Sequence, residues 1–461
     1  MRFNQAALST VDPAWAWARF EPNAERPWSR ELAAHLYRRA AFAANWTQLE
    51  ESLAVGPEAT VEGLLTGAPG TAEFYERVEA SIRALLASGN AQHLPAWWLY
   101  VMLQSPHPLQ EKLTLFWHGH FATSAAKVTD VKLMHDQHAL LRRHALGNFG
   151  PLLLESSRDP AMLLWLDAAN NRKAQPNENF AREVMELFSL GLGNYTEQDI
   201  QQAARAFTGW EVRVGRFRMN RPQHDAGEKT VLGQTGAWNG EDVIRILLEQ
   251  PATGRFLVRK LCRYLVSETE TPPDALVEPL AAEFTARKHD IGWLVGTILR
   301  SNLFYSPLAV RQKVKAPVDF AIGLLRALEG TTNSYSLADD LRDLGQAVFF
   351  PPNVKGWDGG AEWINSATLL SRANLVWALA SGTDGRYGDK APLPPLVSRH
   401  LPRGGAGETA RWFAELLLAA PVSDEVQVQL AALAGDSAGG EQQRLARIVQ
   451  AIATLPEFQL A

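Results

Sequence analysis

The chain has 461 residues, of which 46% are hydrophobic and 21% are charged, and its formal net charge at pH 7 is -5. This length and apolar content are enough for a large core, and the absence of a basic excess argues against a nucleic-acid-binding surface. The single cysteine, Cys262, excludes an internal disulfide. Met1 to Gln5 are not followed by an apolar leader segment, and no run of about 18 apolar residues occurs, so the sequence as given predicts a cytoplasmic protein without a membrane span.

Helical periodicity dominates the chain. From Arg30 to Phe42 apolar residues recur at three- and four-residue spacing, and Gly- or Pro-rich breaks separate similar segments further along. We therefore predict a mainly α fold, with helices over 30–42, 49–66, 72–88, 95–119, 131–146, 178–191, 197–208, 240–268, 275–303 and 311–329.

One region has a different period. Residues 211–219 alternate around Gly215, which is typical of a β-hairpin, and a polar loop at 223–230 leads to the short apolar run Val231-Leu232. We predict a small β-hairpin insertion over 211–235 in a large multi-helix body spanning 1–380. A Pro/Gly-rich loop or linker over 381–407 would lead to a C-terminal helical module at 408–461, which could pack into the same fold.

The first candidate site is the pair His118 and His120. Two histidines at this spacing suit one metal ion where the backbone is extended, whereas in a regular helix they point in different directions. Gly119 is expected to end the helix here, which would free His120 to turn toward a metal. If the helix continues, His120 would instead be a buried histidine beside Leu113 and Phe116.

The second candidate lies at the start of the helix predicted over 178–191. Asn177 or Asn179 would cap this helix, and Glu183 falls inside its apolar arc on a helical wheel. A carboxylate in that position needs a cation, a metal ion or a donor network. Arg182 is spaced for surface ion pairs with Glu178 and Glu186. Glu183 is thus either a ligand or one half of an ion pair that joins two helices.

Three further constellations are polar. His224, Asp225 and Lys229 share a Gly-containing loop that would suit acid–base chemistry but that is also common on inert surfaces. A basic stripe suits an anionic group, although such stripes are more often solvated or salt-bridged. The Pro/Gly loop with Lys355 and Trp357 would form a pocket wall or an ordered surface loop. The stripe comprises Arg255, Arg259 and Arg263, and Trp363 follows the Pro/Gly loop.

Taken together, several segments resemble a bacterial family known as domain of unknown function 1800, over nearly the whole chain. The resemblance implies no activity. It does imply export in many relatives and a sulfatase-like partner protein, although this chain shows no leader. It also runs through 381–407, so that this segment need not separate domains. The matching segments are His35–Ala40, Leu113–Ser124, Arg158–Leu163, Asn177–Trp210, His224–Asp225, Lys229–Thr230, Pro352–Trp357 and Leu455–Gln459.

From these observations we expect a metal-dependent enzyme, most simply a hydrolase, that acts on a polar or anionic substrate. His118, His120 and Glu183 would hold a divalent metal ion, with His224 and Asp225 as catalytic groups. The same ligands would also suit redox chemistry at iron. The alternatives are a non-catalytic binding protein for an anionic glycan or a protein partner, and a helical scaffold. The expected substrate-binding residues are Asn177, Arg182, Lys229, Lys355 and Trp357.

Overall fold

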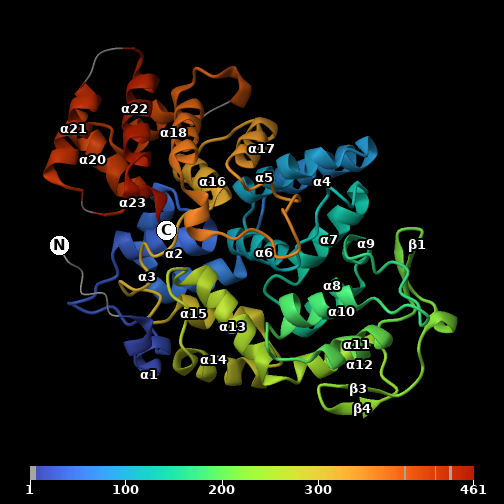
Figure 1. Ribbon diagram of the computed structural model, residues 1–461. Coiled ribbons are helices and arrows are strands. Elements are labelled where there is room, and N and C mark those ends of the chain that lie inside the picture. The colour runs from blue at the N-terminus through green and yellow to red at the C-terminus, as the bar shows by residue number, and fades with distance from the viewer. Residues whose placement is uncertain (1–6, 389–390, 421, 436–438) are drawn as a thin grey trace.

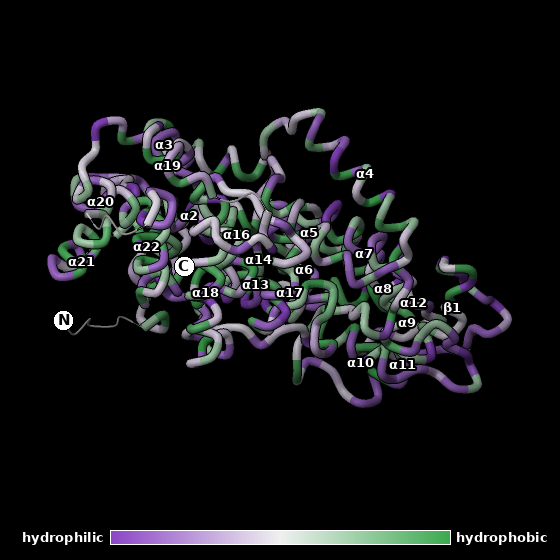
Figure 2. Tube along the Cα trace, turned by 90° about the horizontal axis from the view of Figure 1, so that it is seen from above, coloured by the Kyte–Doolittle hydropathy of each residue, from purple (hydrophilic) through white to green (hydrophobic). Residues whose placement is uncertain are grey.

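The computed structural model describes residues 7–388, 391–420, 422–435 and 439–461. The molecule is elongated, with the C-terminal helices at one end and the β-strands at the opposite end (Figures 1 and 2). Part of the N-terminal segment used to infer the absence of a leader lies outside the described residues, as do residues 389–390 of the predicted linker and residues 421 and 436–438 of the predicted C-terminal module. None of the described helices is long and apolar enough to cross a membrane.

The first part of the chain folds into helices with defined starts. Asn45 forms a capping box with Gln48, and the helix that follows bends where Gly56, with φ of 83°, precedes Pro57. The elements here are η1 (Leu8–Thr10), α1 (Pro13–Trp17), α2 (Arg30–Ala41), α3 (Trp46–Thr66), α4 (Ala72–Ser88), η2 (Ala91–His93), α5 (Leu94–Gln104), α6 (Pro108–His120), α7 (Val131–Arg143), α8 (Phe149–Arg158) and α9 (Pro160–Trp165).

The middle of the chain contains the one π-helical segment among the described residues, η3. It continues directly from α10, which Asn177 caps by accepting the Phe180 N–H. The elements are α10 (Glu178–Glu183), η3 (Val184–Ser189), α11 (Glu197–Ala206), η4 (Arg221–Gln223), α12 (Gly240–Leu248), α13 (Pro251–Leu265), α14 (Asp274–Ala286), α15 (Ile291–Leu299) and α16 (Pro317–Ala327).

Three segments predicted as single helices are each two helices. Residues 95–119 divide between α5 and α6 at Pro108, and residues 240–268 divide between α12 and α13 at Pro251. Each proline stands at the start of the second helix, because its missing N–H costs nothing there and would break a helix interior. Residues 275–303 divide between α14 and α15, where Lys288 and His289 take positive φ values of 57° and 59°.

The predicted β insertion is present as two small antiparallel pairs, which confirms the mainly α class with a hairpin insertion. In the first pair Val212 lies opposite Phe217 around a turn at Gly215, whose φ is 67°. In the second pair Thr230 lies opposite Thr235. The strands are β1 (Trp210–Arg213), β2 (Arg216–Met219), β3 (Lys229–Val231) and β4 (Gln234–Gly236).

The C-terminal helices pack on the body of the protein. Trp412 and Phe413 belong to the same hydrophobic cluster as Phe42 and Phe320, so the residues of the predicted body and of the predicted C-terminal module share one cluster. The elements are α17 (Ser334–Asp343), η5 (Gly360–Trp363), α18 (Ser366–Ser381), η6 (Gly385–Tyr387), α19 (Leu393–His400), α20 (Ala406–Leu417), α21 (Asp424–Gly435), α22 (Glu441–Ala453) and α23 (Pro456–Gln459).

Helix α6 lies between two hydrophobic clusters, in the middle of the molecule (Figure 1). Leu115 belongs to the cluster that includes α16, α20 and α22, whereas Leu113 and Trp117 belong to the cluster that includes α11 to α15. Glu111, Lys112, His118 and His120 of the same helix are also buried. Because α6 is covered on all sides, these polar groups depend on partners from other elements.

The loop at 351–358 lies directly against the end of α6. Gly356 has φ of 81°, and a Cβ atom added to it would lie 2.5 Å from the carbonyl oxygen of Gly119. Only glycine satisfies both the left-handed backbone and this close approach. Gly119 faces open space, because a Cβ added there would meet no atom within 4 Å.

We expect Gly356→Ala to destabilise the protein by about 1–3 kcal/mol, because the new methyl group must displace the end of α6. Gly119→Ala, at the other side of the same contact, is the matched control and should leave stability unchanged or raise it by up to about 1 kcal/mol. Urea unfolding followed by circular dichroism measures both. Equal effects of the two substitutions would contradict the close contact.

Candidate functional site

Segments far apart in the sequence meet at the end of α6. The N–H of Phe349 donates to His118 Nε2 at 2.9 Å, His120 Nε2 donates to the Phe188 carbonyl at 3.1 Å, and Lys260 Nζ lies 3.0 Å from His120 Nδ1. We call this region the motif junction and define it as residues 118–120, 183–189, 355–357 and Lys260.

His118 is 2% exposed and is enclosed by aromatic rings. Its ring centroid lies 5.4 Å from those of Trp98 and Phe349 and 5.7 Å from that of Trp357. Burial lowers the pKa of His118 to about 3. Because Nε2 accepts the N–H of Phe349, the proton of the neutral ring belongs on Nδ1.

His120 is 3% exposed, and both of its ring nitrogens are engaged. Nε2 carries the proton that it donates to the Phe188 carbonyl, which leaves Nδ1 to accept from Lys260. Burial, together with the positive charge of Lys260, holds the pKa of His120 well below its usual value. His118 and His120 are therefore neutral histidines with opposite tautomers.

Lys260 is a half-buried lysine on α13 with an altered acidity. Burial, and secondarily the charge of Arg263, lowers its pKa to about 8. Its Nζ lies 5.0 Å from the ring centroid of Phe256. A substantial fraction of this amine is thus neutral near pH 8, and a neutral amine can accept a proton or attack an electrophile.

The π-helical turn η3 supplies the carbonyl that fixes His120. The Leu190 N–H donates to the Met185 carbonyl at 2.7 Å, and the hydroxyl of Ser189 donates to the Val184 carbonyl at 2.7 Å. Single π-helical turns of this kind occur frequently at functional sites. Here the wide turn places the Phe188 carbonyl beside His120.

Glu183 and Lys355 lie on the outer side of the motif junction. Glu183 is half-buried; burial and the neighbouring carboxylate of Glu186 raise its pKa, while Lys355 and Arg182 act in the opposite direction. Lys355 is exposed, and Trp357 is half-buried against the His118 ring. The expectation that Glu183 is a buried group is therefore met only in part.

His118 and His120, two of the three metal ligands expected from the sequence, are hydrogen-bonded to other groups of the chain. Among the described residues no three histidine, cysteine, aspartate or glutamate side chains are grouped so that they could hold a metal ion. Helix α6 continues through Gly119 to His120, so the two rings point to different sides. The lone pair of His118 Nε2 is used by Phe349 and that of His120 Nδ1 by Lys260. Metal binding at this place would require both bonds to break.

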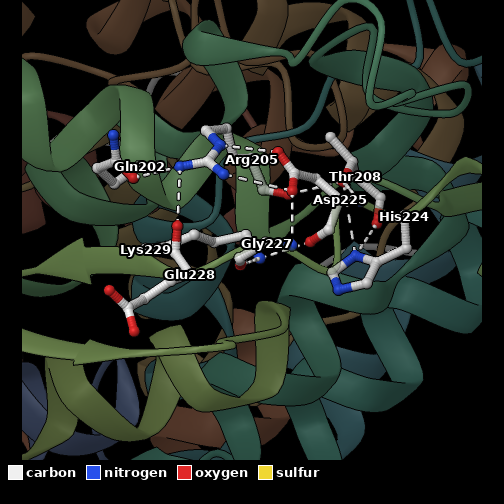
Figure 3. A network of polar contacts seen from close by, with 8 residues as sticks. All are labelled: Gln202, Arg205, Thr208, His224, Asp225, Gly227, Glu228 and Lys229. Carbon is white, nitrogen blue, oxygen red and sulfur yellow. Dashed lines mark hydrogen bonds and ion pairs between the residues drawn. The ribbon is translucent and has the colours of Figure 1, made fainter.

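The loop with His224 and Asp225 is held by its own polar network (Figure 3). Arg205 donates to the carboxylate of Asp225 at 2.7 Å, which lowers the pKa of Asp225. Lys229, only 1% exposed, donates to the Gly227 carbonyl at 2.9 Å. His224 Nδ1 donates to the carbonyl of Thr208 at 2.8 Å. Asp225 thus pairs with Arg205 and not with His224, and the buried Lys229 amine holds the loop by its hydrogen bond to the Gly227 carbonyl.

Within the described residues no hydrogen bond joins His224 Nε2 to another group, and this nitrogen carries the lone pair of the ring. His224 retains an atom that could exchange protons.

Asn177 and Arg182, expected to bind substrate, have structural partners. The Asn177 amide donates to the Leu166 and Asp167 carbonyls at 3.2 and 2.9 Å, in addition to capping α10. Arg182 forms two hydrogen bonds to Glu197 of α11, at 2.8 and 2.7 Å, instead of pairing within its own helix.

The basic stripe on α13 is largely a salt-bridged face. Arg255 pairs with Glu278 at 2.6 Å, and Arg259 pairs with Asp274; both carboxylates belong to α14. This agrees with the reading of the stripe as salt-bridged.

Sequence reasoning missed Lys260, although its signal was present. On a helical wheel Lys260 falls between Phe256 and Leu257, inside the apolar arc of α13. The same argument that singled out Glu183 applies to this lysine.

A family model described as "Protein of unknown function (DUF1800)" matches residues 35–460. No curated protein and no solved structure matches the chain.

We expect Lys260 to be acetylated by acetic anhydride with a rate that rises with pH around a midpoint of about 8, as its lowered pKa requires. Ordinary lysines titrate near 10.4 and should become reactive only at higher pH, on the order of two units above. Competitive labelling read by peptide mass spectrometry gives both values. Arg263→Gln removes a neighbouring positive charge and should move the midpoint upward. A wild-type midpoint at the ordinary lysine value would refute the proposed environment of Lys260.

Proposed function

The chain belongs to the DUF1800 family, whose description assigns no activity, and we propose that it is an enzyme acting on a polar or anionic substrate at the motif junction, with Lys260 as its proton-transfer group. The observation that carries the proposal is the 3.0 Å contact between Lys260 Nζ and His120 Nδ1. It joins a lysine of lowered pKa to a histidine whose tautomer is fixed by the hydrogen bond from its Nε2 to the Phe188 carbonyl.

Each part of this arrangement has a chemical consequence. The neutral amine of Lys260 accepts a proton from water or from a substrate hydroxyl, and the ammonium ion formed can return that proton to a leaving group. His120, held neutral, orients the amine and adds no positive charge beside it. The exposed ammonium of Lys355 supplies attraction for an anionic substrate at the outer side of the junction.

Hydrolysis, the reaction class expected from the sequence, is the first to test. In this proposal Lys260 activates the water, a role that the sequence interpretation gave to a divalent metal ion. A metal-dependent hydrolase or a redox metalloenzyme built on His118 and His120 would first have to break their bonds to Phe349, Phe188 and Lys260. His224 remains a candidate for proton transfer from the hairpin loop, and a sulfatase-like partner protein remains a proposal from the family resemblance.

A non-catalytic binding protein is the second candidate. The specific observation in its favour is that Lys355 is exposed and that Trp357, two residues away, is half-buried on the His118 ring. An exposed cation and a partly exposed aromatic ring in one loop suit an anionic glycan. Such a protein would bind without turnover, and loss of the Lys260 amine would not affect it.

Chromogenic phosphate, sulfate, acyl and glycosyl esters, assayed at pH 7 to 9 with chelator-treated protein, test the proposal. We expect turnover of at least one class to rise with pH around 8, and Lys260→Met to lower kcat by about 10²–10⁴-fold. Lys260→Arg keeps the charge but cannot deprotonate, so it should be equally inactive. Lys132→Met, on the exposed face of α7, is the control and should keep full activity.

Two results would count against this function. If Lys260→Arg retained activity, Lys260 would contribute only its positive charge to binding and would not transfer a proton. Activity that appears only when zinc, manganese or iron is restored, and that is lost in His118→Ala together with stoichiometric metal, would establish the metalloenzyme in its place.

A further inference from the structure

Positive side chains gather in the interior beneath α2 and α16. In the described part of the chain, these cations outnumber the carboxylates whose negative charge stabilises them. The carboxylates are Asp319, the half-buried Glu268 and, for Arg38, Glu31. Glu31 also pairs with Arg311 at 3.1 Å. The buried cations, each no more than 8% exposed, are Arg38, Arg39, Lys112, Lys313, Lys315 and Arg372.

Five of these six cations have hydrogen-bonded partners. Lys112 pairs with Asp319, and Lys313 Nζ donates to the Tyr264 carbonyl at 3.0 Å. The three arginines donate to backbone carbonyls: Arg38 to Leu417 at 2.9 Å, Arg39 to Ala309 at 2.6 Å and Arg372 to Lys315 at 2.8 Å.

Lys315 is the exception. It is 5% exposed, and within the described residues its Nζ has neither a hydrogen bond nor an ion pair. Its contact is with the face of Phe458, whose ring centroid lies 3.7 Å away. A buried ammonium group without a hydrogen-bond acceptor is unfavourable, because cation–π attraction replaces only part of its lost hydration. Burial, and then the charges of Arg38 and Arg372, hold the pKa of Lys315 well below its usual value. An anion beside the amine would favour its protonated form.

Lys315 borders a cavity of about 20 Å³, and Arg38 lines the same cavity. The other lining groups are apolar, among them Phe42, Leu417 and Phe458. The cavity therefore offers two cations and, among the described side chains that line it, no carboxylate. Its lining residues come from α2, α3, α16, α20 and α23, so it lies between the body and the C-terminal helices.

We propose that this cavity binds a monovalent inorganic anion of the size of chloride between Lys315 and Arg38. A space of about 10–15 Å³ already holds one water molecule, so the cavity accepts an ion slightly larger than water, whereas sulfate and phosphate are too large. The anion supplies the acceptor that Lys315 lacks. It would bridge α2 and the segment before α16, beneath the wall formed by Leu417 and Phe458 of the C-terminal helices. This site is independent of the motif junction.

Thermal unfolding at constant ionic strength, with sodium gluconate replaced stepwise by sodium chloride, tests the site. Gluconate screens charge equally but does not fit the cavity. We expect the unfolding midpoint of the wild type to rise with chloride and to saturate, as binding to the folded state requires. Lys315→Met should abolish the rise. Lys313→Met removes a buried lysine that does not line the cavity and should keep it.

Three results would overturn the proposal. The first is a wild-type midpoint that does not respond to chloride; the second is a Lys315→Met variant that keeps the full response. The third is an equal loss in Lys313→Met, which would indicate general charge repulsion in place of a site. Crystals of the wild-type protein grown in sodium bromide give a test that needs no variant. An anomalous peak between Lys315 and Arg38 is expected, and a cavity without one in bromide-saturated crystals would refute the site.

Discussion

The buried polar side chains of α6 determine how the rest of the chain must be arranged. Glu111 accepts from Arg142 of α7 at 2.7 Å, and Lys112 pairs with Asp319 of α16. His118 accepts the backbone N–H of Phe349, and His120 is held between Phe188 and Lys260. An unpaired charge or polar group at any of these positions would cost as much free energy as several good contacts provide. The fold is therefore specified by polar partners as well as by its two apolar clusters.

The same requirement explains why remote segments converge. Residue 349 lies 231 positions from His118, and Lys260 lies 140 positions from His120. The loop that carries Phe349 can approach α6 closely because Gly356 has no side chain. The bonds that satisfy α6 also orient Lys260 at the surface of the junction. The same residues thus satisfy the buried groups of α6 and form the proposed catalytic group. For this reason neither role can be assigned from the residue types alone.

Local signals predicted much of this fold. Apolar periodicity located most helices through α16, Asn177 was one of the two residues expected as a cap, and alternation around Gly215 located the hairpin. The breaks at Pro108 and Pro251 were missed, although a proline at the first position of a helix is a local signal for its start. The partners of the two predicted histidine ligands could not be predicted for a different reason. His118 and His120 seemed free to bind an ion because their true partners are backbone groups and a lysine far along the chain, which no local pattern reveals. Lys315 and its cavity depend on the packing of α20 and α23 and could not have been predicted.

The tautomers of the two α6 histidines test this account most directly. Long-range nitrogen–proton correlation NMR on protein labelled with ¹⁵N-histidine, assigned with His118→Gln and His120→Gln variants, reports the protonated nitrogen of each ring. We predict two neutral rings at pH 7, protonated on Nδ1 in His118 and on Nε2 in His120. Identical tautomers, a protonated imidazolium, or shifts that change when zinc is added would contradict it and return the pair to the role of metal ligands.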